Sequence, residues 1–296
     1  MKTPLFTGSA VALCTPFTED GIDFPKLARL IDFQVENGTE AIIICGTTGE
    51  SATQSTEEHR ETVDFCVRHV AGRIKVIAGT GSNDTHASLS LSKDAEKSGA
   101  DGLLMVTPYY NRPTQHGLIA HYTHIADHVN LPILLYNVPI RTGVSFTADT
   151  YKILSEHPQI IGTKEASGDF SLIAKTMDLC ADDFHIYSGN DDQTVPMIAL
   201  GAKGLISVAA NIIPNEMADM CQKALAGDFK GATELQLKYT KLFAALYLET
   251  NPIPIKTALN LIGLEAGDLR LPLCNMLPEN LEKLKQAMTA AGLSLR

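Results

Sequence analysis

The chain has 296 residues, of which 45% are hydrophobic and 20% are charged, and its formal net charge is -10. This length and composition predict a globular protein with one large domain or two small ones, and they exclude a disordered chain. The acidic balance argues against binding to nucleic acid or to an anionic membrane, because both attract clustered Lys and Arg. We therefore expect the partners to be small molecules or further copies of the chain.

No apolar run approaches the roughly 20 residues that span a bilayer, and the first residues lack the apolar stretch of a signal peptide. These observations predict a soluble protein of the cytoplasm. The six cysteines lie far apart and form no C-x-x-C pair, which favours reduced core thiols over a disulfide or metal site. They are Cys14, Cys45, Cys66, Cys180, Cys221 and Cys274.

Short apolar runs alternate with amphipathic helical patterns along most of the chain. Each run ends in a polar or glycine-rich loop, and a helix follows; Ser55 and Glu58, for example, predict a capping box at one helix start. Strands are expected at residues 9–13, 41–45, 76–78, 102–106, 133–136, 160–164, 184–187 and 204–208. This alternation predicts a parallel (β/α)8 barrel, also called a TIM barrel.

A doubly wound sheet is the competing fold. Such a sheet usually carries G-x-G-x-x-G in its first strand-to-helix turn, and that pattern is absent here. Beyond residue 214 the pattern is helical, with interruptions at residues 251–254 and 271–273, and these helices exceed what a barrel needs. We therefore predict a catalytic barrel domain over residues 1–214 and a C-terminal helical region over residues 215–296, packed on the barrel or on a partner subunit.

The sixth expected strand begins at Ile160 and ends at a lysine, Lys164. With a period of two, Ile160, Gly162 and Lys164 share one face, so an inward Ile160 implies an inward Lys164. Burial lowers the pKa of an ammonium group and makes it an amine that can attack a carbonyl. On this segment alone, however, a solvated lysine at a strand end is the more frequent arrangement.

A barrel places its active site at the carboxyl ends of its strands, so the loops after the strands converge. No carboxylate pair or histidine stands at these strand ends, which argues against metal-assisted hydrolysis and two-carboxylate glycoside chemistry. A lysine amine can condense with a keto acid, hydroxyls can relay protons, and arginine can hold a carboxylate. The residues gathered there are Thr47, Thr48, Tyr109, Tyr110, Tyr136, Arg141, Lys164, Gly189 and Asn190. They suggest carbon–carbon bond formation through a Schiff base.

Five motifs together resemble the dihydrodipicolinate synthases, also called 4-hydroxy-tetrahydrodipicolinate synthases. The resemblance extends from Gly8 to Leu273 and implies the barrel with a C-terminal helical part. The motifs are GTTGE at 46–50, TPYYN at 107–111, YNVPxRTG at 136–143, KEASG at 164–168 and NPIP at 251–254.

The resemblance implies that Lys164 forms an imine with pyruvate, whose enamine adds to aspartate β-semialdehyde in the diaminopimelate route to lysine. Tyr136 would shuttle protons, and Thr47 would link it to Tyr110 of a neighbouring subunit. The covalent imine would replace a cofactor, and no metal is implied. A homotetramer built as a dimer of dimers is expected.

The substrate-binding residues also follow from the resemblance. Thr48 would hold the pyruvate carboxylate, and Arg141 would bind the semialdehyde carboxylate at the pocket mouth. Gly189 and the main chain of Ile206 would complete the pocket.

Many family members are inhibited by lysine, which binds in a cleft between subunits. The residues that match this candidate allosteric cleft are Ser51, Ala52, His59, Asn83 and Tyr109. Thr56, however, stands where lysine-sensitive bacterial members have a histidine, and Ala87 where they have a glutamate. A lysine ammonium without its carboxylate loses roughly 1.5–3 kcal/mol if it is desolvated, so we expect weak or absent inhibition.

Two other functions are compatible with the fold. One is an aldolase of the same fold, such as N-acetylneuraminate lyase or a sugar-acid aldolase; Arg141 argues against it, because a sugar needs neutral hydrogen-bonding groups there. The other is a barrel that senses a keto acid without turnover.

Two further patterns have simpler interpretations than function. His116, His121, His124 and His128 follow near-helical spacing, and we interpret them as exposed helix residues, because no zinc-site ligands accompany them. We interpret Asp191 and Asp192 as caps of the helix that follows them.

Overall fold

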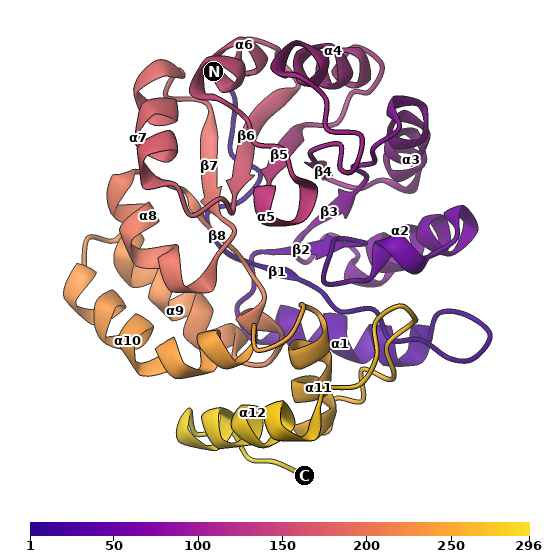
Figure 1. The fold of residues 1–296 in the computed structure, drawn as a ribbon, viewed down its shortest axis with the longest axis vertical. Helices are drawn as coiled ribbons and strands as arrows, with labels where there is room; N and C mark the ends of the chain where they lie inside the picture. Colours follow the sequence, from indigo (N-terminus) through magenta and orange to yellow (C-terminus); the bar gives the residue numbers. More distant parts are fainter.

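The computed structural model describes residues 1–296. Its strands are all parallel and close into a barrel in chain order, with β1 paired to β8, which confirms the predicted (β/α)8 barrel (Figure 1). The strands are β1 (Gly8–Ala12), β2 (Ala41–Ile44), β3 (Lys75–Gly79), β4 (Gly102–Val106), β5 (Ile133–Asn137), β6 (Ile160–Glu165), β7 (His185–Ser188) and β8 (Gly204–Ser207).

Helices surround the barrel. The predicted capping box is present at the start of α2, where Ser55 and Glu58 each accept a hydrogen bond from the other's main chain. The α-helices are α1 (Phe24–Glu36), α2 (Thr56–Val70), α3 (Thr85–Ser98), α4 (Gln115–Ala126), α5 (Pro139–Thr142), α6 (Ala148–Ser155), α7 (Phe170–Leu179), α8 (Thr194–Leu200), α9 (Pro214–Leu225), α10 (Phe229–Ala245), α11 (Ile253–Leu261) and α12 (Pro278–Ala290). Short 3-10 turns are η1 (Ser51–Thr53), η2 (Asp191–Gln193) and η3 (Ala209–Asn211).

The apolar core has two layers. One cluster, which includes Ile43, Leu134 and Tyr136, fills the barrel interior, and a larger one lies between the strands and the helices. Neighbouring strand residues alternate between these layers, as the pleat requires. The barrel closes where β1 meets β8, and a Cβ on Gly204 would lie 1.9 Å from the Gly8 carbonyl oxygen, so only glycine fits there.

Strand β6 departs from regular alternation. Its pairing with β5 moves from Ile160 directly to Gly162, so Ile161 is an extra residue, as in a β-bulge. Ile160 packs in the outer cluster, and Ile161 belongs to the interior cluster. The prediction that Ile160 and Lys164 share a face is therefore wrong. Lys164 nevertheless faces inward, because the bulge changes the phase of the strand before it reaches the lysine.

The C-terminal helices extend the ring on one side. α9 lies against β1 and β8 and completes the helices around the barrel, so the predicted division at residue 214 separates α9 from the strands that it covers. α10 packs on α8 and α9, and α12 packs on α10 and α11. In Figure 1, α11 and α12 lie beyond the ring, and α12 is the outermost helix on that side. None of the helices combines the length and apolarity that a membrane span requires.

The six cysteines are all free, but not all of them lie in the core. Cys14, Cys45, Cys66 and Cys221 are buried. The prediction of a core thiol is wrong for Cys274, which is exposed, and Cys180 is only partly buried.

Candidate active site

A cavity of about 740 Å³ lies at the carboxyl ends of the barrel strands. The loops after β2, β5 and β7 and the end of β6 contribute to its lining, together with the chain that precedes α11. Most of the predicted catalytic and substrate-binding residues meet there. They are Thr47, Thr48, Tyr136, Arg141, Lys164 and Gly189.

Lys164 is the one amine in this lining. Its side chain is buried, with the residue 4% exposed, and its Nζ lies 4.6 Å from the centroid of the Tyr136 ring. Gly189 leaves the space for the lysine, because a Cβ at that position would lie 3.0 Å from Lys164 Cε and 2.6 Å from Ala166 Cβ. A keto acid bound in the cavity would therefore meet an amine and a phenol together, the groups that imine chemistry requires.

Two substrate-binding candidates are held by one residue, Asn251, which lies just before α11. Its Nδ2 donates to Thr48 Oγ1 at 3.0 Å, and its main-chain carbonyl accepts from Arg141 Nη2 at 2.9 Å. Asn251 is buried, and its own Oδ1 has no hydrogen-bond partner. Together with residues 247–250, Asn251 forms a wall of the cavity that comes from outside the barrel.

Tyr110 and Ile206 do not line the cavity. Tyr110 is 90% exposed, with a positive φ of 70°, and Ile206 is fully buried in the barrel interior. On β8, the lining residue is Val208, just beyond the strand. Thr47 and Tyr136 share the cavity, but a relay that includes Tyr110 is not assembled within one chain.

Glu165, directly after Lys164, is also buried. Its carboxylate accepts hydrogen bonds from Tyr151 Oη at 2.8 Å, from Asn137 Nδ2 at 3.1 and 3.2 Å and from the Ser167 main chain at 2.9 Å. Burial raises the pKa of Glu165, and these hydrogen bonds oppose the rise. The network fixes the end of β6 against β5 and α6, and so it orients the strand that carries the lysine.

The prediction that Asp191 and Asp192 cap the following helix is wrong, because no side chain caps α8. Asp191 instead accepts from Ser207 Oγ at 2.5 Å and from the main-chain N–H groups of Val208 and Ala209. Burial raises the pKa of Asp191, while these hydrogen bonds and the charge of Lys164 oppose the rise. The Asp191 carboxylate, which follows β7, thus satisfies main-chain N–H groups at the end of β8 and the start of η3.

A second cavity, of about 470 Å³, adjoins the first, and Thr47, Arg141 and Asn251 line both. The residues of the candidate allosteric cleft that line it are Ser51, Ala52, His59 and Tyr109. Asn83 does not line it, although its neighbour Ser82 does.

Neither of the two departing residues, Thr56 and Ala87, lines the second cavity. Leu91 lines the second cavity, and Ala87 precedes it by one turn of α3. Thr56 is exposed at the first residue of α2. His59 is committed to the protein, because its Nε2 bonds to the Gly79 carbonyl at 2.8 Å, and burial lowers its pKa.

The four histidines in and just after α4 do not form one exposed face. His116, His124 and His128 are exposed, but the prediction is wrong for His121, which is 7% exposed. Its Nδ1 pairs with Thr85 Oγ1 at 2.9 Å, and burial lowers its pKa to about 4. The structure contains no group of three His, Cys, Asp or Glu side chains that could hold a metal ion.

Asn251 and Glu165 were given no role from the sequence, although each left a signal. Asn251 stands in a Pro-rich break between helices, and Glu165 is a charge inside a buried strand. Outside the cavity, Lys256 is the only charge in the helix IPIKTALNL. These signals indicate that the residues are unusual at their positions, but they do not identify hydrogen-bond partners that lie far away in the sequence.

The chain is similar throughout its length to known proteins. A sequence model of the Dihydrodipicolinate synthetase family matches residues 5–291. The 4-hydroxy-tetrahydrodipicolinate synthase of Thermoanaerobacter sp. (strain X514) is 51% identical over 291 residues, which cover 98% of each chain.

Solved structures agree with this likeness. The chloride inhibited dihydrodipicolinate synthase from Acinetobacter baumannii, complexed with pyruvate, is 43% identical with a TM-score of 0.94 and covers 97% of this chain and 99% of its own. The enzyme from Cyanidioschyzon merolae with lysine bound is 41% identical with a TM-score of 0.96 and covers 99% of this chain and 100% of its own. By sequence and fold, the chain belongs to the dihydrodipicolinate synthase family.

Proposed function

We propose that the protein condenses pyruvate with L-aspartate 4-semialdehyde to give 4-hydroxy-tetrahydrodipicolinate, and that the reaction passes through a Schiff base on Lys164. The observation that carries this proposal is a buried lysine beside a tyrosine, in a cavity that an arginine also lines. Family membership supplies the identity of the two substrates. This reaction serves the diaminopimelate route to lysine, which we place in the cytoplasm.

The amine of Lys164 attacks the keto carbon of pyruvate, and loss of water gives the imine. Removal of a methyl proton gives the enamine, whose carbon bonds to the aldehyde carbon of the second substrate while the aldehyde oxygen takes up a proton. The amine of that substrate then attacks the imine carbon, which closes the ring and releases Lys164 as a free amine. Apart from the two substrates, these steps take up and release only protons and water, and none of them needs an oxidant or a reductant. The covalent imine therefore replaces a cofactor.

We propose that Tyr136 carries the protons of these steps, with Thr47 linking it to Tyr110 of a partner subunit. The exposed position of Tyr110, outside the cavity of its own chain, is compatible with a role in a neighbouring site. Ile140 and Leu271 are also exposed, at 92% and 80%, and burial of such side chains would favour association. A homotetramer assembled as a dimer of dimers would offer Tyr110 a neighbouring active site and would offer Ile140 and Leu271 a subunit surface to pack on.

We propose that Thr48 and Gly189 contact the pyruvate unit, with Thr48 at its carboxylate, while Arg141 binds the carboxylate of the semialdehyde. Replacing Arg141 by Ala is expected to raise the KM for the semialdehyde about tenfold to 100-fold, because a charge-assisted hydrogen bond is lost. The measurement is steady-state kinetics with each substrate varied in turn.

The pyruvate KM should change much less in this variant. Arg68→Ala is the matched control, because Arg68 is exposed in α2 and pairs with Asp64. Equal effects of Arg141→Ala on both KM values would contradict the assigned role.

A coupled assay tests the proposed function directly. The protein is expected to turn over pyruvate with aspartate semialdehyde faster than it forms or cleaves the sugar acid made from pyruvate and N-acetylmannosamine. Higher activity with the sugar would reject the synthase in favour of the aldolase alternative. Tight binding of pyruvate without turnover of either acceptor would favour the sensor.

Regulation by lysine is expected to be weak. Initial rates should change little at millimolar lysine, because Ala87 offers no carboxylate and Thr56 no imidazole to a ligand in the second cavity. The double variant Thr56→His/Ala87→Glu should bind lysine about tenfold to 100-fold more tightly, since a desolvated charge-assisted contact contributes roughly 1.5–3 kcal/mol. Clear inhibition of the unaltered protein by millimolar lysine would overturn this prediction.

A further inference from the structure

A buried ion pair lies behind the loop that carries Thr47 and Thr48. Lys256 Nζ in α11 is 2.7 Å from Glu50 Oε1, and both side chains are only 1% exposed. The same ammonium donates to the Thr15 carbonyl at 2.9 Å. Lys256 is the single charged residue of α11, and its partner comes from the loop after β2.

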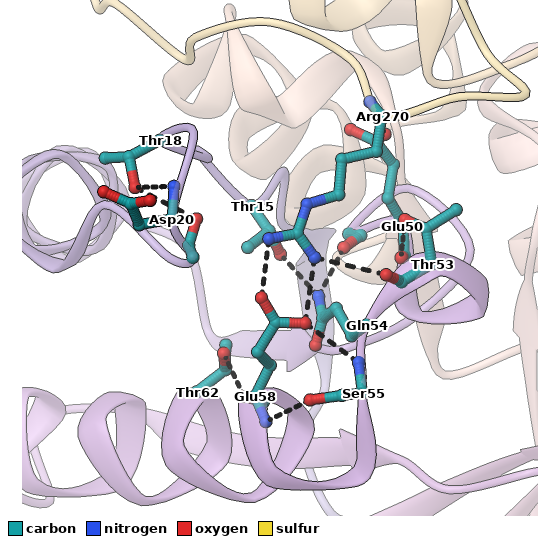
Figure 2. Close-up of polar contacts among 12 residues, drawn as sticks. Thr15, Thr18, Asp20, Glu50, Thr53, Gln54, Ser55, Glu58, Thr62 and Arg270 are labelled. Carbon is teal, nitrogen blue, oxygen red and sulfur yellow. Dashed lines mark hydrogen bonds and ion pairs between the residues drawn. The ribbon is translucent and has the colours of Figure 1, made fainter.

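The second oxygen of Glu50 binds the chain beyond α11. Its Oε2 accepts from the main-chain N–H of Arg270 at 3.0 Å. Figure 2 shows the Arg270 side chain reaching down toward Glu58, with Thr53 beside its guanidinium. Thr53 and Glu58 both belong to the segment that follows Glu50. Its guanidinium forms two hydrogen bonds with the Glu58 carboxylate, at 2.9 and 2.6 Å, and one with the Thr53 carbonyl at 3.2 Å.

Glu50 also closes the turn that presents the two threonines. Its main-chain N–H donates to the Thr47 carbonyl at 3.1 Å, and its φ of 54° is in the left-handed region. Gly49 packs so closely that a Cβ there would lie 3.1 Å from the Leu13 carbonyl. One short turn therefore presents Thr47 and Thr48 to the cavity and the Glu50 carboxylate to a buried anchor.

Stability alone is a poor explanation for this anchor. A buried ion pair carries a large desolvation cost, and well-packed apolar residues of similar volume often serve stability equally well. Its geometric effect is specific, however, because all partners of the carboxylate come from the C-terminal part of the chain. The same part also holds Thr48 directly, through Asn251.

We propose that Glu50 is a positioning residue for the reaction: anchored by Lys256 and the Arg270 main chain, it fixes the turn that sets Thr47 and Thr48 in the active-site cavity. The inference rests on the proposed function, because it assigns Thr48 to the pyruvate carboxylate. It makes the helices outside the barrel part of the substrate-binding machinery.

The test compares Glu50→Gln with Glu58→Gln. Both remove a carboxylate that binds Arg270, but only Glu50 is part of the threonine turn. Borohydride trapping at a series of pyruvate concentrations reads the pyruvate site without any acceptor. Glu50→Gln is expected to raise the half-saturating pyruvate concentration and to lower kcat, each about tenfold, because small misplacements of binding groups are costly. Glu58→Gln should change both less than about twofold.

Melting temperatures separate positioning from stability. Glu50→Gln is expected to lower Tm, since it leaves the Lys256 charge without its partner, and Glu50→Gln/Lys256→Met should recover much of that loss. The double variant should nevertheless keep the raised half-saturating pyruvate concentration of Glu50→Gln. Recovery of Tm and of pyruvate binding together would overturn the proposal, as would a Glu50→Gln protein with wild-type trapping.

If Glu50→Gln does not yield folded protein, Glu50→Gln/Lys256→Met is tested alone. A raised half-saturating pyruvate concentration in that variant supports the positioning role, and a wild-type value overturns it. Failure of the proposed function is distinguishable, because it would be seen in the wild type, as an absence of trapped pyruvate or of turnover with the semialdehyde. Failure of the positioning role would be seen only in the pattern of the variants.

Discussion

Replacing Lys164 by Ala is expected to abolish the pyruvate adduct that borohydride traps and to lower kcat by at least about 10³-fold, because removing a covalent nucleophile removes the reaction path itself. The chain offers no substitute amine at this place, since Lys164 is the only lysine that lines the cavity. Intact-protein mass measures the adduct, and the coupled assay measures kcat.

Lys75→Ala serves as the control, because Lys75 is half-exposed at the start of β3 and pairs with Asp101. Its adduct and its rate should match those of the wild type. Peptide mapping of the reduced wild-type protein should place the added mass on Lys164. An adduct on the other buried lysine, Lys256, or a Lys164→Ala protein that still forms the adduct, would contradict the mechanism.

Replacing Tyr136 by Phe is expected to lower kcat by about 10²–10³-fold while the fold is kept, since positioned proton transfer contributes on this scale. The ring would still lie beside the lysine, so the loss would report the hydroxyl alone. The adduct should still form in this variant, but more slowly.

Tyr187→Phe is the matched control for this change. Tyr187 is also buried inside the barrel, but its hydroxyl donates to the Phe6 carbonyl at 2.8 Å and does not line the cavity. Removing it should leave kcat within about twofold, because only a structural hydrogen bond is lost. A Tyr136→Phe enzyme as fast as Tyr187→Phe would exclude Tyr136 as the proton carrier.

The barrel was predictable because each of its strands is locally apolar and each is followed by its own helix. Residues at strand ends could be grouped for the same reason, since parallel strands bring their carboxyl ends together. Lys164 shows the limit of this reasoning. An inward Lys164 was inferred only on the condition that Ile160 also faces inward, but the extra residue Ile161 breaks the regular alternation between them, and a bulge has no marker in this sequence.

The residues that sequence reasoning missed act through partners far away along the chain. Asn251 and Thr48 are 203 positions apart, and Lys256 and Glu50 are 206 apart. Such contacts depend on how the C-terminal helices dock, which local patterns do not encode. Asp191 was misassigned for a related reason, because a carboxylate before a helix is a common cap, but here it accepts from main-chain N–H groups at the start of η3, beyond the next strand.

The wall that Asn251 builds has a consequence for the order of synthesis. Chains are made from the N-terminus, so all eight strands of the barrel, with Lys164 and Tyr136, are synthesised before the residues of α11. Until then the nucleophile is present, but the side of the pocket that steadies Thr48 and Arg141 is open. Synthesis of the C-terminal helices therefore completes the binding pocket. A nascent or truncated chain that lacks them would contain the Lys164 amine without an organised binding pocket.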